Sequence, residues 1–187
     1  GMYNGINLII PLTKPVQFTR PATPTTPRPL HPYVLGVLLG DGCFGKNLIE
    51  QNDVRLATPD QFIVDRFTAL GYDMTHFTSN ERNTCNTYRI TNNNIVDDVR
   101  TLKLDGCLAD TKHIPNQYKY STIDERIQLM QGLMDTDGYV DSRGHMSYTT
   151  ISKQLAEDVA FVARSLGAKC TITFDTGKYK DEGGDIH

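Results

Sequence analysis

A short helix-forming motif occurs twice, and this repeat constrains the fold more than any other feature of the 187-residue chain. The apolar stretches 34–42 (VLGVLLGDG) and 130–138 (MQGLMDTDG) both end in Asp-Gly, 96 residues apart. Leu-Gly pairs at 70–71 and 166–167, each expected to close a later helix, repeat at the same interval. Two independent landmarks in one register indicate two similar subdomains within one unit, because the interval is too long for a solenoid repeat.

The apolar periodicity and the turn residues predict an αββαββα order for the first copy. We expect helices over 33–40, 59–71 and 95–102, and strands before residue 54 and near 54–57, 72–77 and 87–91. Thr58 should cap the second helix, with a proline at its first position, and Gly42 should end the first helix in a left-handed conformation.

The second copy repeats the first helix over 124–136 but is expected to be truncated. Its last strand would map onto 184–186, and the helix that should cover it would begin after the last residue, His187. The proline-rich stretch 21–32 favours extended chain, and the apolar run 6–10 could form a strand.

The expected organisation has three parts, which are an extended N-terminal segment with its proline-rich linker (1–30), a first subdomain with a connecting loop (31–120) and an incomplete second subdomain (121–187).

Composition excludes several classes of protein. No apolar run approaches 18 residues, so we expect no membrane span, and no secretory signal is evident, which favours an intracellular protein. The four cysteines lack the spacing of a zinc site or a disulfide framework. A net charge of -3 and an isoelectric point near 5.9 argue mildly against nucleic-acid binding, because such proteins usually have a basic surface.

Both motif helices carry small residues four positions apart, Gly36 with Gly40 and Gly132 with Thr136. Residues with this spacing lie on one face of a helix, so the two faces can pack with their backbones very close together. If the helices pack about a pseudo-two-fold axis, the aspartates that end the two motifs arrive side by side.

Such a pair of aspartates, Asp41 and Asp137, is electrostatically unfavourable. Each carboxylate would lie at the negative end of its helix dipole and would also face a like charge. A hard divalent cation, bound through carboxylate oxygens and helix-end carbonyls, would offset both effects. Metal-assisted attack of water on a phosphodiester is the reaction that suits such a site.

The two motifs, their spacing and the order of elements resemble the LAGLIDADG homing endonucleases, most closely the endonuclease domains embedded in inteins. The likeness covers residues 31–180, and residues 4–18 look like the segment that joins an intein splicing domain to its endonuclease. It implies an α+β fold with pseudo-two-fold symmetry and antiparallel, saddle-shaped sheets. It also implies a site-specific DNA endonuclease that makes a metal-dependent double-strand break.

The same resemblance assigns the catalytic site. Asp41 and Asp137 would be catalytic metal ligands, with the carbonyls of Gly40 and Thr136 beside them and Mg²⁺ or another divalent cation as the cofactor. The family also carries a lysine before Ile-Pro ahead of its second motif, which here is Lys112. This lysine would polarise water or stabilise the phosphoryl charge.

The sheets of the family bind double-stranded DNA in the major groove, where strand side chains contact bases and phosphates. The expected contacts are Lys46, Arg55, Arg82 and Arg89 in the first copy and Arg143, Lys169, Lys178 and Lys180 in the second. We expect a monomer, although the uncovered strand edge of the second copy would also permit a dimer.

Some residues depart from the pattern of the family. Leu39 stands where the first motif would have its first aspartate, whereas Asp135 keeps that aspartate in the second motif. No cysteine or serine opens the chain as a splicing nucleophile and no His-Asn closes it, so self-splicing is not expected. These departures and the acidic charge leave two alternatives, a degenerate LAGLIDADG protein that binds DNA without cutting it and an RNA maturase of the same fold.

Overall fold

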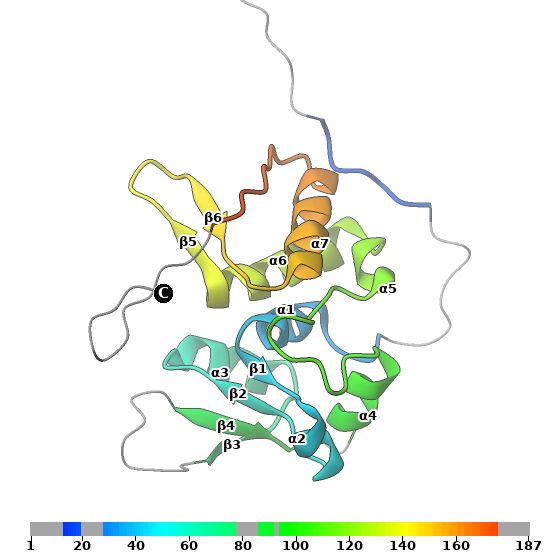
Figure 1. The fold of residues 1–187 in the computed structure, drawn as a ribbon, viewed down its shortest axis with the longest axis vertical. Helices are drawn as coiled ribbons and strands as arrows, with labels where there is room; N and C mark the ends of the chain where they lie inside the picture. Colours follow the sequence, from blue (N-terminus) through cyan, green and yellow to red (C-terminus); the bar gives the residue numbers. More distant parts are fainter. Residues whose placement is uncertain (1–12, 20–27, 78–85, 92–93, 176–187) are drawn as a thin grey trace, which may run out of the picture.

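Two central helices, α1 (Pro32–Asp41) and α6 (Ile123–Asp137), cross in the middle of the molecule, and the other elements lie on either side of them (Figure 1). The computed structural model describes residues 13–19, 28–77, 86–91 and 94–175. The run 6–10, most of the proline-rich linker and the strand expected at 184–186 lie outside these residues.

The first half continues from α1 into a four-stranded antiparallel sheet with strand order β1-β2-β4-β3. Its elements after α1 are β1 (Gly42–Cys43), α2 (Lys46–Glu50), β2 (Arg55–Ala57), α3 (Gln61–Ala69), β3 (Met74–Phe77), β4 (Thr87–Ile90) and α4 (Ile95–Thr101). The expected hairpin of β3 and β4 is confirmed by direct antiparallel pairing.

The second half consists of α5 (Asn116–Lys119), α6, β5 (Gly138–Val140), β6 (Met146–Tyr148) and α7 (Lys153–Ser165). The strands β5 and β6 form an antiparallel two-stranded sheet, while α5 and α7 pack against α6. The expected α+β fold, with duplicated helix-and-sheet units and antiparallel sheets, is confirmed. No helix in the described parts of the chain combines the length and the apolar character that crossing a membrane requires.

One local prediction for the first half is wrong, and one helix was not predicted. Helix α3 is capped by Asp60, whose carboxylate accepts a hydrogen bond from the backbone N–H of Phe62 at 2.9 Å. The Thr58 hydroxyl instead accepts from the N–H of Asp60, which places the cap two residues later than expected. Helix α2 was not expected, because five residues are too few to show a helical repeat of apolar positions.

The contact between α1 and α6 is as close as the glycine spacing predicts. A Cβ atom added to Gly36 would overlap the carbonyl oxygen of Leu129, and it would lie 2.9 Å from the backbone nitrogen of Leu133 and 3.0 Å from the Cα of Gly132. A Cβ added to Gly132 would likewise overlap the carbonyl oxygen of Tyr33. Side chains are therefore excluded from the crossing point, where the two backbones touch.

Helix α1 is apolar around its whole circumference and buried from Pro32 to Leu39, as expected of a helix enclosed by other elements. Its start is defined by His31, whose ring nitrogen accepts from the N–H of Tyr33 at 3.3 Å, and by proline at the first helical position. Helix α6 begins with a capping box, in which Thr122 and Glu125 each bond the backbone N–H of the other.

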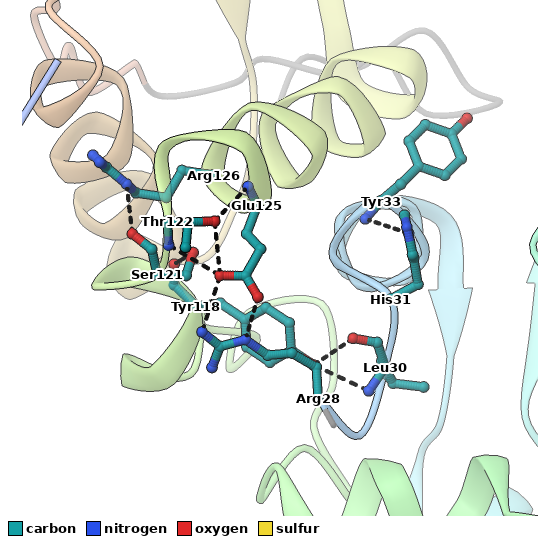
Figure 2. A network of polar contacts seen from close by, with 9 residues as sticks. All are labelled: Arg28, Leu30, His31, Tyr33, Tyr118, Ser121, Thr122, Glu125 and Arg126. Carbon is teal, nitrogen blue, oxygen red and sulfur yellow. Dashed lines mark hydrogen bonds and ion pairs between the residues drawn. The ribbon is translucent and has the colours of Figure 1, made fainter. Parts of the chain in front are cut away.

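The starts of the two central helices are also tied to each other (Figure 2). The Arg28 guanidinium binds the Glu125 carboxylate at 2.9 and 3.2 Å. The hydroxyl of Tyr118 accepts from the N–H of Leu30 and donates to its carbonyl oxygen. Burial alone would raise the pKa of Glu125, but its bonds to Arg28 and Thr122 lower it to about 2.

Residues 13–19 lie against the second half. The N–H of Val16 donates to the carbonyl oxygen of Ser165 at 2.8 Å. The fully buried Arg126 donates to the carbonyl oxygens of Val16 and Ser121 and to the Ser165 hydroxyl. Its guanidinium also lies 4.7 Å from the centre of the Phe18 ring. This segment therefore supplies hydrogen-bond acceptors to a buried charge on α6.

The close crossing predicts that Gly36→Ala is strongly destabilising. The added methyl group must push the helix backbones apart, because no flexible side chain can move out of its way. We expect a loss of about 1–3 kcal/mol in the free energy of unfolding, measured in urea. Gly45→Ala is the matched control, since its Cβ would lie 3.7 Å from the nearest Leu108 carbon, and it should change stability by less than about 0.5 kcal/mol. Equal stability of the two variants would contradict the crossing geometry.

Candidate active site

Both central helices run directly into strands at their Asp-Gly ends. The glycines are extended, with φ and ψ of −74° and 146° at Gly42 and −87° and 151° at Gly138, so the expected left-handed ending at Gly42 is wrong. Both positions require glycine because a side chain would not fit. A Cβ on Gly42 would lie 2.7 Å from the Cα of Leu38, and a Cβ on Gly138 would lie 2.6 Å from the Cα of Met134.

The last turns of α1 and α6 bring the two motif ends together. A Cβ on Gly40 would overlap the Thr136 hydroxyl and would lie 3.2 Å from a carboxylate oxygen of Asp137. The Thr136 hydroxyl itself donates back into α6, to the carbonyl oxygens of Gly132 and Leu133. The carboxylate of Asp137 therefore lies against the end of α1, beside Asp41.

The two aspartates carry the electrostatic penalty that the sequence predicts. Burial raises the pKa of Asp41, the charge of Asp137 raises it further, and Lys112 partly opposes both effects. Burial also raises the pKa of Asp137, again against the influence of Lys112. Ionising the pair at neutral pH therefore costs folding free energy, so the site attracts positive charge.

Lys112 lies at the end of α1 and is only 6% exposed. Its ammonium group donates to three carbonyl oxygens, those of Leu38 at 3.1 Å, Gly40 at 2.7 Å and Gly42 at 2.9 Å. Burial lowers the pKa of Lys112, while the charges of Asp137 and Asp41 raise it. The lysine therefore caps the C-terminus of α1 and neutralises part of the charge of the acid pair.

The role expected for Lys112 stays a prediction, and its hydrogen bonds limit how the lysine could act directly. An ammonium group has three protons, and three carbonyl oxygens already accept hydrogen bonds from Lys112. Direct donation to a water molecule or a phosphoryl oxygen would require one of these bonds to break. The backbone of the lysine is held by the second half, because the Ser152 hydroxyl, which caps α7, donates to the Lys112 carbonyl at 2.7 Å.

The oxygen atoms at the acid pair suit a hard divalent cation. Two carboxylates approach the ends of two helices, and the Gly40 carbonyl keeps a second lone pair besides the one that Lys112 uses. Within the described residues, no group of three or more His, Cys, Asp or Glu side chains forms an alternative metal site. Mg²⁺ is commonly held by one or two carboxylates together with water and phosphate oxygens.

The face of the first sheet that points away from the core carries Arg55 and Arg89. These residues are direct partners on β2 and β4, so they share one face, while their neighbours Leu56 and Tyr88 are buried on the other. The buried carboxylate of Asp53 binds both guanidinium groups, at 2.6 Å to Arg55 and 3.0 Å to Arg89. Burial alone would raise the pKa of Asp53, but these bonds outweigh it and lower the pKa.

The structure places the other expected DNA contacts outside the strands, or does not describe them. Lys46 lies on α2, exposed, with Glu50 3.9 Å away. Arg143 lies in the exposed turn between β5 and β6, and Lys169 follows α7. Arg82, Lys178 and Lys180 lie outside the described residues.

Sequence reasoning missed two residues near this site. Asp53 could have been found, because an acid two residues before Arg55 lies within reach of it along an extended strand. Tyr148 gave no such signal. Tyr148 pairs with Gly138 in the second half, and Leu56 pairs with Gly42 in the first half. Helix α2 lies between β1 and β2 in the first half, so Leu56 and Tyr148 are not 96 residues apart and the sequence repeat does not align them.

A cavity of about 480 Å³ lies away from the acid pair, between the end of α4, α5 and α7. Its lining includes Asp158, which already binds the ammonium of Lys119 at 2.6 Å and the N–H of Ile114 at 2.9 Å. None of the residues that line it belongs to the acid pair. This cavity is therefore separate from the candidate site at the ends of the two central helices.

Solved structures share this architecture. The structure of I-DmoI in complex with DNA and Mn is similar with a TM-score of 0.55, at 17% identity, over 80% of this chain and 84% of that chain. Mesophilic variants of the homing endonuclease I-DmoI give a TM-score of 0.56 at 16% identity, over 80% of this chain and 83% of theirs. Residues 124–186 match the family of LAGLIDADG-like domains. The second half of the chain therefore matches LAGLIDADG-like domains in sequence, and the chain shares the fold of a homing endonuclease.

LAGLIDADG homing endonucleases are DNA endonucleases. Part of the chain is also similar in sequence to a replicative helicase. It is 35% identical over 75 residues to the replicative DNA helicase DnaB of Mycobacterium intracellulare. The matched part covers 40% of this chain and 13% of that helicase, so the chain spans only a small part of the length of its relative.

The raised pKa values predict that Asp41→Asn and Asp137→Asn each leave the metal-free protein at least as stable as the parent at pH 7. Each substitution removes a charge that a helix dipole disfavours, and the charge of Asp137 also acts on Asp41. The expected gain is up to about 1 kcal/mol for Asp41→Asn and smaller for Asp137→Asn, because Asp137 is exposed and solvent screens its charge. A folded pKa above the unfolded value means that stability is lost as pH rises through the folded pKa. The gain should therefore vanish near pH 3, where both states are protonated.

Urea unfolding in EDTA at pH 7 and pH 3 measures this effect. Acid-sensitive contacts elsewhere, such as the Glu125 carboxylate with its pKa of about 2, are the same in all three proteins and cancel in the comparison. Variants that are clearly less stable than the parent at pH 7 in EDTA would show that the aspartates serve the fold rather than a cation.

Proposed function

We propose that this chain is a site-specific DNA endonuclease of intein origin, which makes a double-strand break with a divalent cation held at Asp41 and Asp137. One observation carries the proposal. Two carboxylates with raised pKa values lie together at the ends of two helices whose backbones touch. An arrangement that costs folding free energy is best explained by a ligand that compensates for it.

The donor atoms favour Mg²⁺ or a similar hard cation. The two carboxylates would be its charged ligands, and the carbonyl oxygens of Gly40 and Thr136 would lie next to it. A divalent cation bound there would supply the positive charge that activates water and polarises a phosphodiester. One solved relative contains both DNA and Mn, which supports this choice of cofactor.

The residues of the chain prepare this site before any substrate binds. Lys112 lowers the pKa of both aspartates and so favours the ionised form that a cation requires. Its ammonium group donates to three carbonyl oxygens, in α1 and at the start of β1, and these hydrogen bonds fix the position of the positive charge. Pseudo-two-fold symmetry gives one central helix and one aspartate to each half, so each half would serve one DNA strand.

The first sheet provides the DNA-binding surface in this proposal. Asp53 holds the guanidinium groups of Arg55 and Arg89 on the open face, and the Phe77 ring lies 4.2 Å from the Arg55 guanidinium carbon. The two guanidinium groups and the one carboxylate leave a net positive charge on this face of the sheet, although the net charge of the whole chain is -3. Pre-oriented guanidinium groups suit phosphates and the guanine edge. The other six basic residues named above are proposed to extend the surface.

The DnaB match supports the intein origin. A LAGLIDADG domain has no evident part in unwinding DNA, so sequence similarity to a helicase over 75 residues is best explained by an endonuclease segment inserted in that relative. We propose that this chain is such a segment and that it acts inside the cell as a monomer. The three parts 1–30, 31–120 and 121–187 would then be a connecting segment and the two halves of the endonuclease.

The DNA-binding surface predicts that Arg89→Gln weakens binding to duplex DNA and lowers its salt dependence. The amide can still bond Asp53, but the charge that would neutralise a phosphate is lost. The slope of log affinity against log salt should fall by about 1, measured by fluorescence anisotropy. Arg100→Gln is the control, because Arg100 lies on α4 and bonds Asp97 and the Ile49 carbonyl. Identical slopes for the two variants would refute the assignment of this face.

Cleavage is the direct test of the proposed function. The substrate is a supercoiled plasmid that carries the coding sequence flanking this chain in its gene, with the segment for the chain removed. We expect linear product with Mg²⁺ or Mn²⁺ and none in EDTA, and no product with Asp41→Asn or Asp137→Asn. Asp135→Asn is the matched control on the same helix, since an amide can still accept from the Tyr33 hydroxyl, and it should cut the plasmid.

The possible results of the binding and cleavage assays distinguish the alternatives. Salt-dependent DNA binding without cutting under any condition would favour the degenerate binding module. Tighter binding to structured RNA than to duplex DNA would favour a maturase. Cutting by both asparagine variants would place the chemistry elsewhere in the protein.

A further inference from the structure

The hydroxyl of Tyr148 is buried without a hydrogen-bond partner. Across the parts of the chain that the structure describes, it is the only buried side-chain nitrogen or oxygen atom in this condition. Tyr148 ends β6 and pairs directly with Gly138, the residue that follows Asp137. The adjacent N–H, of Thr149, donates to the Asp137 carbonyl at 3.3 Å, so this strand end is attached to the end of α6.

Packing accounts for the ring of Tyr148 but not for its hydroxyl. The ring lies against the hydrophobic core, a role that phenylalanine would fill equally well. Burying a hydroxyl that makes no hydrogen bond is unfavourable, and buried polar groups in proteins are nearly always paired. No atom of the described residues takes this role, so a partner from outside the chain would satisfy the hydroxyl.

The surroundings identify the kind of partner. Tyr148 pairs with the residue that follows Asp137, and the charges of Asp137 and Asp41 both act on its phenol, so the hydroxyl lies near the acid pair. A phenol is protonated at neutral pH and can donate a hydrogen bond. Carboxylates only accept hydrogen bonds, so oxygen atoms gathered by a cation at these two aspartates would lie close to this donor.

In the first half, the position that matches Tyr148 carries no polar group. Leu56 occupies the matching position opposite Gly42 and is fully buried. Lys112 instead supplies the polar group at the end of α1. The two halves of the pseudo-symmetric site therefore differ, with an ammonium group at the end of α1 and a phenol at the end of α6.

We propose that Tyr148 is a positioning residue of the acid pair, whose hydroxyl bonds an oxygen atom held beside Asp137 and Asp41, from either a water molecule on the cation or a phosphate of the DNA. This inference rests on the proposed function and extends it to a residue outside the motif. Groups that orient the ligands of a metal from outside its coordination shell commonly change its affinity or activity by 10-fold to 100-fold.

The experiment compares Tyr148→Phe with the parent, with Tyr139→Phe and with Asp137→Asn. Tyr139→Phe is the matched control, because it removes a hydroxyl from the same hairpin at a residue that is 66% exposed. The first readout is Mn²⁺ binding without DNA, followed by the electron paramagnetic resonance signal of the free ion. The second is the single-turnover cleavage rate with saturating DNA, and the third is the melting temperature in EDTA.

We expect Tyr148→Phe to melt at or above the temperature of the parent in EDTA, because the unpaired hydroxyl contributes nothing to the metal-free fold. Weaker Mn²⁺ binding without DNA, by about ten-fold, would identify the partner as water on the cation. Unchanged Mn²⁺ binding with a cleavage rate about ten-fold lower would identify a phosphate oxygen. Tyr139→Phe should match the parent in Mn²⁺ binding without DNA and in melting temperature.

Tyr148→Phe that binds Mn²⁺ and cuts DNA as the parent does would overturn the inference. A lower melting temperature in EDTA than that of Tyr139→Phe would also overturn it, since the hydroxyl would then serve the fold. If Asp137→Asn binds Mn²⁺ as tightly as the parent, the metal site itself is wrong and the role of Tyr148 falls with it. Loss of Mn²⁺ binding in Asp137→Asn, together with Mn²⁺ binding and a cleavage rate in Tyr148→Phe that equal those of the parent, would refute the role of Tyr148 while leaving the metal site intact.

Discussion

The contact between the backbones of α1 and α6 is the constraint on which the rest of the structure depends. Gly36 and Gly132 leave no room for a side chain where the helices cross, so each helix limits the position of the other. Both helices end in Asp-Gly and run straight into a strand. The crossing therefore positions the two aspartates, and the strands that follow them carry the two sheets of the proposed DNA-binding surface.

This arrangement concentrates negative charge, and the protein compensates for it differently in each half. Lys112 lies beneath the end of α1 and bonds three carbonyl oxygens, while the end of α6 faces the unpaired hydroxyl of Tyr148. The pKa values of both aspartates stay raised in spite of Lys112. The acid pair therefore forms a site where a cation would be favoured.

The central site could be predicted from sequence because helical spacing translates directly into geometry. Four-residue spacing placed the small residues on one face, and the shared register placed Asp41 beside Asp137. Other features depend on contacts between distant segments, which no local pattern encodes. The ion pair of Arg28 with Glu125 and the bond from Arg126 to Val16 join residues far apart in the chain.

A single cation site shared by Asp41 and Asp137 is the central claim of this account, and anomalous X-ray scattering tests it most directly. Crystals of the protein with duplex DNA, grown with Mn²⁺, should show an anomalous difference peak between the two carboxylates. The same peak should be absent from crystals of Asp137→Asn grown in the same way. A peak bound to other residues, or none near the aspartates at full occupancy of the DNA, would contradict the account.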